Sequence, residues 1–200
     1  SSPLCDPAED ACGTSPFSGG PVLEIGAGIG QVSIALAKYG LKMIANDREP
    51  ALMFQIDENA AANAVSDSVK PLLMDWADAD TRESRQILRA QRFSAVVGVE
   101  LVYSSAQAKL APIIIQNALP KGGRALIMNA KKHRDGVSEF ATALDAAGFT
   151  VRTTTVPADD IDTSVWGDYE PGQEYCAYDI DVPPLKSQGA RAAPAASRHR

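Results

Sequence analysis

The segment VLEIGAGIG, residues 22–30, decides the fold of this chain. Its apolar first half predicts a buried strand over residues 22–25, and residues 31–38 behind it have the pattern of a helix. The glycines at 26, 28 and 30 permit backbone conformations closed to other residues and let a ligand approach the main chain. The segment therefore predicts a binding turn at the end of a buried strand.

The spacing of the glycines distinguishes this turn from that of dinucleotide-binding enzymes. The pattern is Glu-x-Gly-x-Gly-x-Gly, whereas dinucleotide sites carry Gly-x-Gly-x-x-Gly. Glu24 lies two residues before Gly26, where its charge would repel the diphosphate that a helix N-terminus otherwise attracts. An acid at this place suits a cationic ligand with an ammonium group. The spacing thus disfavours a nicotinamide-dependent oxidoreductase.

Strand and helix patterns alternate along the rest of the chain. Further strands are expected at 42–45, 69–74, 93–99, 125–128, 149–156 and 175–180, and further helices at 50–64, 81–92, 105–119 and 137–147. Pro112 is expected to kink its helix or to mark its start. The last two strands have no long helix between them, so they should pair antiparallel. The class is α/β: a doubly wound, mostly parallel seven-stranded sheet with helices on both faces, of the Rossmann-like type.

Composition divides the chain into three parts. Residues 1–20 are rich in Pro, Gly, Ser and Asp without periodicity and are expected to form a flexible lead. Residues 21–182 are expected to form the folded domain. Residues 183–200 are rich in Pro, Ala, Ser and Arg and are expected to be a disordered tail.

Charge and composition disfavour several classes of protein. The net charge of −6 and the pI near 4.9 lack the basic footprint of a nucleic-acid-binding protein. Three cysteines and two histidines, without a Cys-x-x-Cys pair, make neither a structural zinc site nor a disulfide framework, so no metal is expected. No apolar run approaches the ~20 residues of a membrane span. We expect a monomer in the cytoplasm or the nucleus.

Acidic residues follow the second and third predicted strands, at the edge of the sheet where such folds bind ligands. Asp47 can accept both hydroxyls of a ribose, because a carboxylate offers two acceptor oxygens. It can also be the N-cap of the helix that follows. Asp75 can accept from an adenine amino group while Trp76 covers the adenine face. A loop acid beside a partly buried aromatic residue is the plain alternative for this second pair.

The segment VVGVELVYSS, residues 96–105, places Glu100 and Tyr103 just past the fourth strand. Alone, Glu-x-x-Tyr is a short pattern that a helix-start acid and a core tyrosine also produce. Together with the glycine turn, Asp47 and the Asp-Trp pair, it resembles methyltransferase family 16. These protein lysine methyltransferases of the seven-strand type carry Asp/Glu-x-x-Tyr after strand four.

The resemblance implies an enzyme that transfers a methyl group from S-adenosylmethionine (SAM) to a lysine side chain of a protein. The residues that it assigns to SAM are Glu24, Gly26, Ala27, Gly28, Gly30, Asp47, Asp75, Trp76 and Val99. By this assignment Glu24 faces the ammonium directly or through water, Asp47 faces the ribose, and the Asp-Trp pair faces the adenine. Glu100 and Tyr103 are the implied catalytic residues, at the floor of a lysine channel.

Methyl transfer from a sulfonium is a favourable in-line displacement, so such an enzyme mainly positions the nucleophile. A lysine must first lose a proton, and desolvation in an aromatic-walled channel lowers its pKa. Two alternatives stay open. One is a methyltransferase of the same fold that acts on a small molecule or a protein histidine. The other is an inactive SAM-binding module that works by binding a partner.

Overall fold

The computed structural model describes residues 17, 19–131, 135–156 and 174–185. The strands are β1 (Val22–Ile25), β2 (Met43–Asp47), β3 (Val69–Leu73), β4 (Ala95–Val99), β5 (Gly123–Ala130), β6 (Thr150–Val156) and β7 (Tyr175–Val182). The helices are α1 (Gln31–Lys38), α2 (Pro50–Ala62), α3 (Arg82–Gln91), α4 (Ser105–Ala118) and α5 (Val137–Ala146), with a 3-10 helix η1 (Trp76–Asp78). Most of the predicted lead and tail lies outside the described residues.

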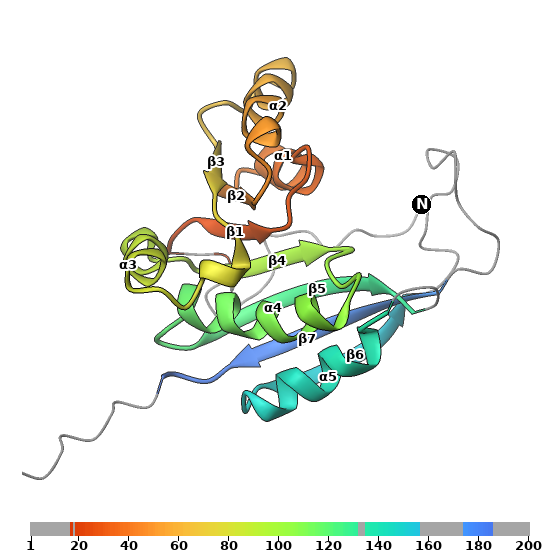
Figure 1. The fold of residues 1–200 in the computed structure, drawn as a ribbon. Coiled ribbons are helices and arrows are strands. Elements are labelled where there is room, and N and C mark those ends of the chain that lie inside the picture. Colours follow the sequence, from red (N-terminus) through yellow and green to blue (C-terminus); the bar gives the residue numbers. More distant parts are fainter. Residues whose placement is uncertain (1–16, 18, 132–134, 157–173, 186–200) are drawn as a thin grey trace, which may run out of the picture.

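Within the described residues the seven strands form one sheet in the order β3-β2-β1-β4-β5-β7-β6 (Figure 1). Neighbouring strands from β3 to β5 run parallel, and β7 pairs antiparallel with both β5 and β6. The predicted mostly parallel sheet with an antiparallel last pair is therefore confirmed. Strand β5 exceeds the expected 125–128 at both ends, because its pairing with β7 runs from Gly123 to Ala130.

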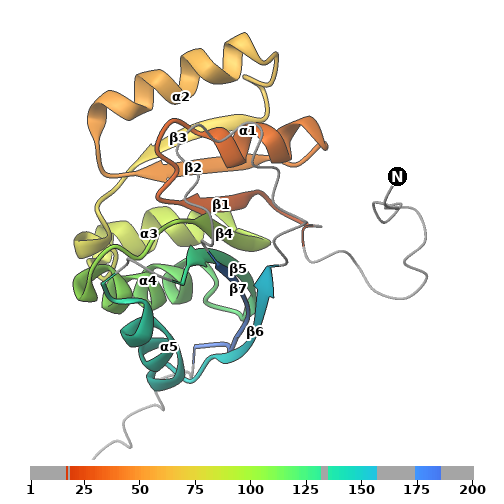
Figure 2. The same ribbon diagram turned by 90° about the vertical axis from the view of Figure 1, so that its right-hand side faces the viewer.

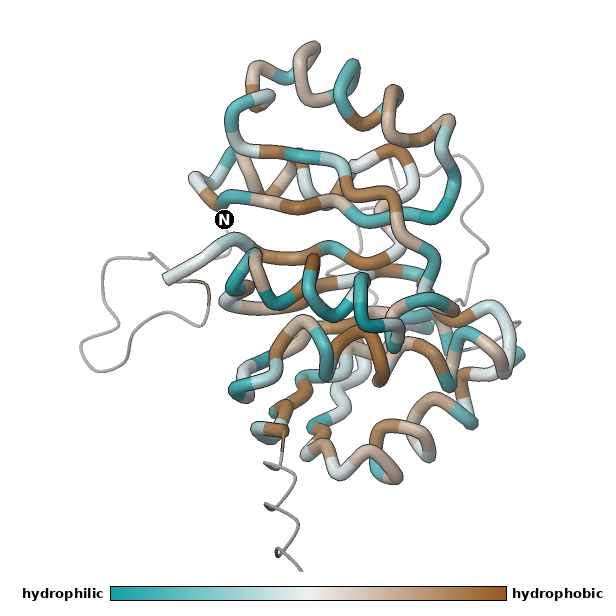
Figure 3. The backbone as a smooth tube through the Cα atoms, turned by 60° about the vertical axis from the view of Figure 1, so that its left-hand side comes forward, coloured by the Kyte–Doolittle hydropathy of each residue, from teal (hydrophilic) through white to brown (hydrophobic). Residues whose placement is uncertain are grey.

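Helices cover both faces of the sheet, as expected. In Figure 2, α1 and α2 lie beside β1, β2 and β3 on one face, while α3, α4 and α5 lie on the other. Each face has its own apolar cluster, and successive residues of β1 enter different ones: Val22 joins Ile34 and Ile56, whereas Leu23 joins Ile114. This alternation follows from the two-residue period of a strand. Figure 3 shows the apolar stretches along the central strands.

Pro112 lies inside α4 and does not mark its start, since the helix begins at Ser105. A proline in a helix removes one backbone hydrogen bond and crowds the preceding turn. Here the ring is buried on the apolar side of the helix with Ala111 and Ile115. We attribute the continuity of the helix to this burial, which offsets the lost hydrogen bond.

The carboxyl ends of β1, β2, β3 and β4 meet at one edge of the sheet, because these strands are parallel neighbours. These strand ends and the segments that follow them contain the glycine turn, Asp47, the Asp-Trp pair and the Glu-x-x-Tyr pair. No helix in the described part of the chain combines the length and the apolar character needed to cross a bilayer. In the same part, no three His, Cys, Asp or Glu side chains group so as to hold a metal ion.

Candidate functional site

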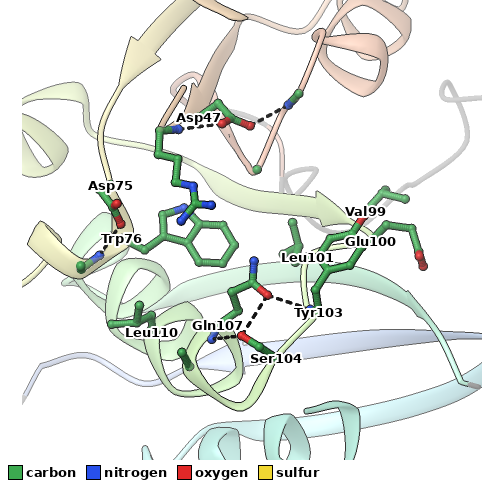
Figure 4. A pocket seen from close by; sticks show the side chains of 15 residues that line it. Asp47, Asp75, Trp76, Val99, Glu100, Leu101, Tyr103, Ser104, Gln107 and Leu110 are labelled. Carbon is green, nitrogen blue, oxygen red and sulfur yellow. Dashed lines mark hydrogen bonds between the residues drawn. The ribbon is translucent and has the colours of Figure 1, made fainter. Parts of the chain in front are cut away.

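A cavity of about 560 Å³ opens at this edge of the sheet (Figure 4). Its size is within the ~300–1,000 Å³ range of small-molecule sites. The predicted residues that line it are Gly26, Gly28, Asp47, Asp75, Trp76, Val99, Glu100 and Tyr103. The lining residues that sequence reasoning missed are Arg48, Ala77, Leu101, Ser104, Ala106, Gln107 and Leu110. Glu24, Ala27 and Gly30 are not among the lining residues.

The glycines of the turn have different roles. Gly28 adopts φ +54°, and a Cβ added to it would meet no atom within 4 Å, so its main chain borders open space. A Cβ at Gly26 would come within 2.9 Å of the side chain of Leu101. Gly30, at φ +82°, is the N-cap of α1 and packs against Ile56. Gly28 thus borders open space, whereas Gly26 and Gly30 allow the side chains of Leu101 and Ile56 to pack closely on the turn.

Ala27, between the first two glycines, is buried with 7% of its surface exposed. Its backbone N–H donates to the carbonyl of Asn46 at 2.8 Å, and its own carbonyl accepts from Gly30 at 2.8 Å. These bonds hold the turn against the end of β2. The structure therefore shows Ala27 as part of the turn's support.

Glu24 is buried in β1, with 3% of its surface exposed. Its carboxylate accepts a hydrogen bond from the Ser33 N–H at 2.8 Å and another from the Ser33 hydroxyl. Burial raises the pKa of this carboxyl from 4.5 to about 7; the bonds from Ser33 lower it, and the charge of Asp47 raises it. Glu24 thus joins β1 to α1 and is not among the lining residues, and its predicted contact with an ammonium, directly or through water, stays a prediction.

Asp47 connects the end of β2 to the glycine turn. Its Oδ2 accepts from the Gly28 N–H at 2.9 Å. Its Oδ1 accepts from the N–H groups of Arg48 and Glu49 at 2.7 and 3.2 Å. The N-cap of α2 is Glu49, so the alternative interpretation of Asp47 as that N-cap is wrong. Its carboxylate instead forms part of the cavity wall beside Gly28.

Trp76 is held in place by a buried amide. Its indole Nε1–H donates to Oδ1 of Asn46 at 3.0 Å. Asn46 is fully buried, and its amide nitrogen donates to the carbonyls of Leu72 and Met74 at 3.1 and 3.0 Å. Sequence reasoning missed Asn46, although an amide within the apolar strand MIAND is a signal for a specific hydrogen-bond partner.

Asp75 is the N-cap of η1 and accepts from the Ala77 N–H at 2.9 Å. This bond aligns its carboxylate beside Trp76 on the cavity wall, as Figure 4 shows. Both residues therefore lie where the sequence predicted an adenine contact, and the contact itself stays a prediction.

The segment after β4 turns sharply at Glu100, which adopts φ +54°. Its N–H donates to the Met128 carbonyl at 2.7 Å, and its Oε1 accepts from the Ala130 N–H at 2.5 Å. In Figure 4 the carboxylate points away from Gln107. Tyr103, with 49% of its surface exposed, borders the cavity at the other end of this segment.

A capping motif begins α4 next to Tyr103, in which Ser104 is the N-cap. The Ser104 hydroxyl accepts from the Gln107 N–H at 3.4 Å. The Gln107 Oε1 accepts from the Tyr103 N–H at 2.9 Å and from the Ser104 hydroxyl at 3.3 Å. The pattern Ser-x-x-Gln is a sequence signal for such a helix start, and it would have located both residues.

Comparison with known proteins agrees with this geometry. The sequence profile of the family described as lysine methyltransferase matches residues 4–147. The chain belongs to this family. It is thereby a SAM-dependent methyltransferase, and the suspected resemblance is confirmed. No curated protein matches the sequence significantly.

Solved structures share the fold of this lysine methyltransferase family member at low identity. The glycopeptide N-methyltransferase MtfA is 16% identical with a TM-score of 0.61, over 82% of this chain and 90% of its own. Streptococcus pneumoniae Sp1610 in complex with S-adenosyl-L-methionine is 12% identical with a TM-score of 0.57, over 87% and 71%. P. horikoshii TYW2 in complex with MeSAdo is 20% identical with a TM-score of 0.54, over 84% and 58%. The chain thus spans less than two thirds of that last protein.

Proposed function

We propose that this protein transfers the methyl group of SAM to a lysine side chain of a protein substrate. One observation carries the proposal: Glu100 and Tyr103 line the same cavity as Gly28, Asp47 and Trp76. The Glu-x-x-Tyr pair and the glycine turn are far apart in the sequence. Their meeting in one cavity, in a chain of the lysine methyltransferase family, favours an acceptor amine beside the cofactor.

The residues present fit the cofactor. Gly28 lines the cavity with main chain that borders open space, which suits the amino-acid portion of SAM. Asp47 has carboxylate oxygens that can accept from a ribose. The indole ring of Trp76, fixed by its bond to Asn46, has an aromatic face on which an adenine can stack. Asp75 and the backbone at Val99 complete this wall.

When bound, SAM supplies a methyl group activated by the positive charge of its sulfonium. The side chains of Trp76, Leu101 and Leu110 form an apolar part of the lining, and a lysine amine that packs against them loses contact with water, which lowers its pKa and favours the neutral form. Tyr103 can accept a hydrogen bond from that amine or pack on its methylene stem. The Glu100 carboxylate accepts from the Ala130 N–H, and its charge beside the cavity attracts the incoming ammonium, which then loses its proton to water.

The proposal is tested by incubating the protein with isotope-labelled SAM and an extract of its source, followed by mass spectrometry of the labelled band. The expected result is a labelled methyl group on a lysine side chain. Label on a histidine or in the small-molecule fraction would overturn the choice of acceptor. Cofactor binding without transfer to any component would favour the inactive binding module.

A further inference from the structure

We infer that Asn129, which no motif of the family resemblance includes, is a positioning residue for the segment that carries Tyr103. Asn129 lies near the end of β5, with 1% of its surface exposed. It does not line the cavity, so it acts through the backbone that does. The kinetic consequences of this inference rest on the proposed function, whereas its structural consequences do not.

Hydrogen bonds run in both directions between the ends of β4 and β5. The Asn129 Oδ1 accepts from the N–H groups of Leu101 and Val102 at 2.9 and 3.3 Å. In return the Glu100 Oε1 accepts from the Ala130 N–H at 2.5 Å. We call these five residues the β4–β5 clasp. Each strand end thus uses one side chain to satisfy the backbone of the other.

The clasp is needed because the chain leaves β4 in an unfavourable conformation. Glu100 adopts φ +54°, in the left-handed region that non-glycine residues rarely occupy. Directly after it, Leu101 and Val102 are buried, with 3% and 1% of their surface exposed. A buried N–H without an acceptor is costly, so their N–H groups need the Asn129 oxygen. Asn129 therefore selects this turn over the alternatives open to the chain.

The same turn positions two residues that line the cavity, Leu101 and Tyr103. The Leu101 side chain packs so closely on Gly98 that a Cβ there would lie 2.5 Å from it, and it lines the cavity. Tyr103 follows two residues later, and the Gln107 side chain accepts from its N–H at 2.9 Å. Asn129 thus holds the backbone at Leu101 and Val102, and Gln107 holds it at Tyr103.

Two variants of Asn129 separate the oxygen from the bulk of the side chain. Asn129→Asp keeps an acceptor oxygen for the two N–H groups in an isosteric side chain. Asn129→Leu keeps a similar volume and removes the acceptor. Asn117→Leu is the matched control, because Asn117 is also a buried amide, with 5% exposure, but its nitrogen donates to the Ala79 carbonyl, outside the clasp.

The first measurement is amide hydrogen exchange at Leu101 and Val102, which needs neither cofactor nor acceptor. In the parent protein both amides should exchange at least ~100-fold slower than in an unfolded chain. Asn129→Leu should remove most of that protection, whereas Asn129→Asp and Asn117→Leu should retain it. Unprotected amides in the parent protein would overturn the inference, even if Asn129→Leu fails to fold.

The second measurement is turnover on the identified lysine together with SAM affinity. Asn129→Leu should lower kcat by roughly 10- to 100-fold and SAM affinity by much less, because a small displacement of a positioned group is enough to slow transfer. Asn129→Asp should rescue turnover. If Asn129→Leu and Asn117→Leu lower kcat equally, Asn129 only stabilises the fold and the inference is wrong. If the parent protein methylates no lysine, the proposed function is wrong. The exchange experiment still tests whether Asn129 protects the amides of the β4–β5 clasp.

Discussion

The two walls of the cavity are held in different ways. On the wall after β2 and β3, acidic side chains accept from nearby backbone: Asp47 from the next two residues, and Asp75 from Ala77. On the wall after β4, the backbone depends on distant residues, through the bonds of Glu100 and Asn129. The first wall also has long-range bonds, from Gly28 to Asp47 and from Trp76 to Asn46, but bonds within two residues orient both of its carboxylates. The second wall exists only once β4 and β5 are paired.

The largest effect is expected at Gly28. Gly28→Val should weaken SAM binding by more than ~100-fold, because a branched side chain on a cavity-lining residue with positive φ would distort the turn and obstruct the approach of a ligand to the main chain. Gly40→Val is the control, since Gly40 also has a positive φ, +89°, with no atom within 4 Å of a Cβ, but lies outside the cavity. Calorimetric titration with SAM should separate the two variants, although both carry ~1–2 kcal/mol of backbone strain. Equal affinities would show that Gly28 borders no cofactor.

The second prediction concerns Asp47, whose carboxylate accepts from backbone N–H groups and is also expected to accept from a ribose. Asp47→Ala should weaken SAM by roughly 1–3 kcal/mol, the cost of leaving buried hydroxyls without a charged acceptor. It should also lower the melting temperature, because three N–H groups lose their acceptor. Asp47→Asn keeps an acceptor for Arg48 and should recover stability more than affinity. A fall in stability with unchanged SAM affinity would refute the ribose role.

Tyr103 tests the second wall alone. Tyr103→Phe removes only the hydroxyl and should lower kcat and kcat/KM together by roughly tenfold, with SAM affinity unchanged. Tyr39→Phe is the control, since Tyr39 is 84% exposed and does not line the cavity. Steady-state kinetics on the identified lysine is the measurement. If Tyr103→Phe turns over as fast as the parent protein, the hydroxyl has no role in transfer and Tyr103 contributes only packing.

The smallest effect on binding is expected at Glu24, whose carboxylate bonds to Ser33 instead of lining the cavity. Glu24→Gln should change SAM affinity by less than about threefold, because the Glu24 carboxylate lies outside the cavity lining and Gln keeps its shape. A loss of affinity near that of Asp47→Ala would restore the predicted ammonium contact.

The same variant should change the pH dependence of stability. Because the folded-state pKa of Glu24 is raised from 4.5 to about 7, its protonated form stabilises the fold below pH 4.5. That contribution, ~3 kcal/mol, is lost as the pH rises to about 7. Urea denaturation from pH 4.5 to 8 should show this loss in the parent protein and not in Glu24→Gln. Parallel profiles for the two proteins would contradict it.

Much of the fold was predictable because it depends on local patterns. The apolar run before Gly26 and the glycine spacing indicated β1, its turn and α1. The antiparallel last pair followed from the absence of a helix pattern between 149–156 and 175–180. Pro112 was only partly predictable, since burial of its ring depends on packing against the rest of the core.

The sequence by itself determined the family, the cofactor class and the strand ends that meet in the cavity. Those features depend on residue types at short spacings and on the rule that ligands bind at the carboxyl ends of parallel strands. The tertiary structure alone decided that Glu24 bonds to Ser33, that Asn46 holds Trp76, and that Asn129 supports the turn at Glu100. The physical reason is that nearly all buried polar groups are paired in space, and folding, not sequence spacing, chooses the partner.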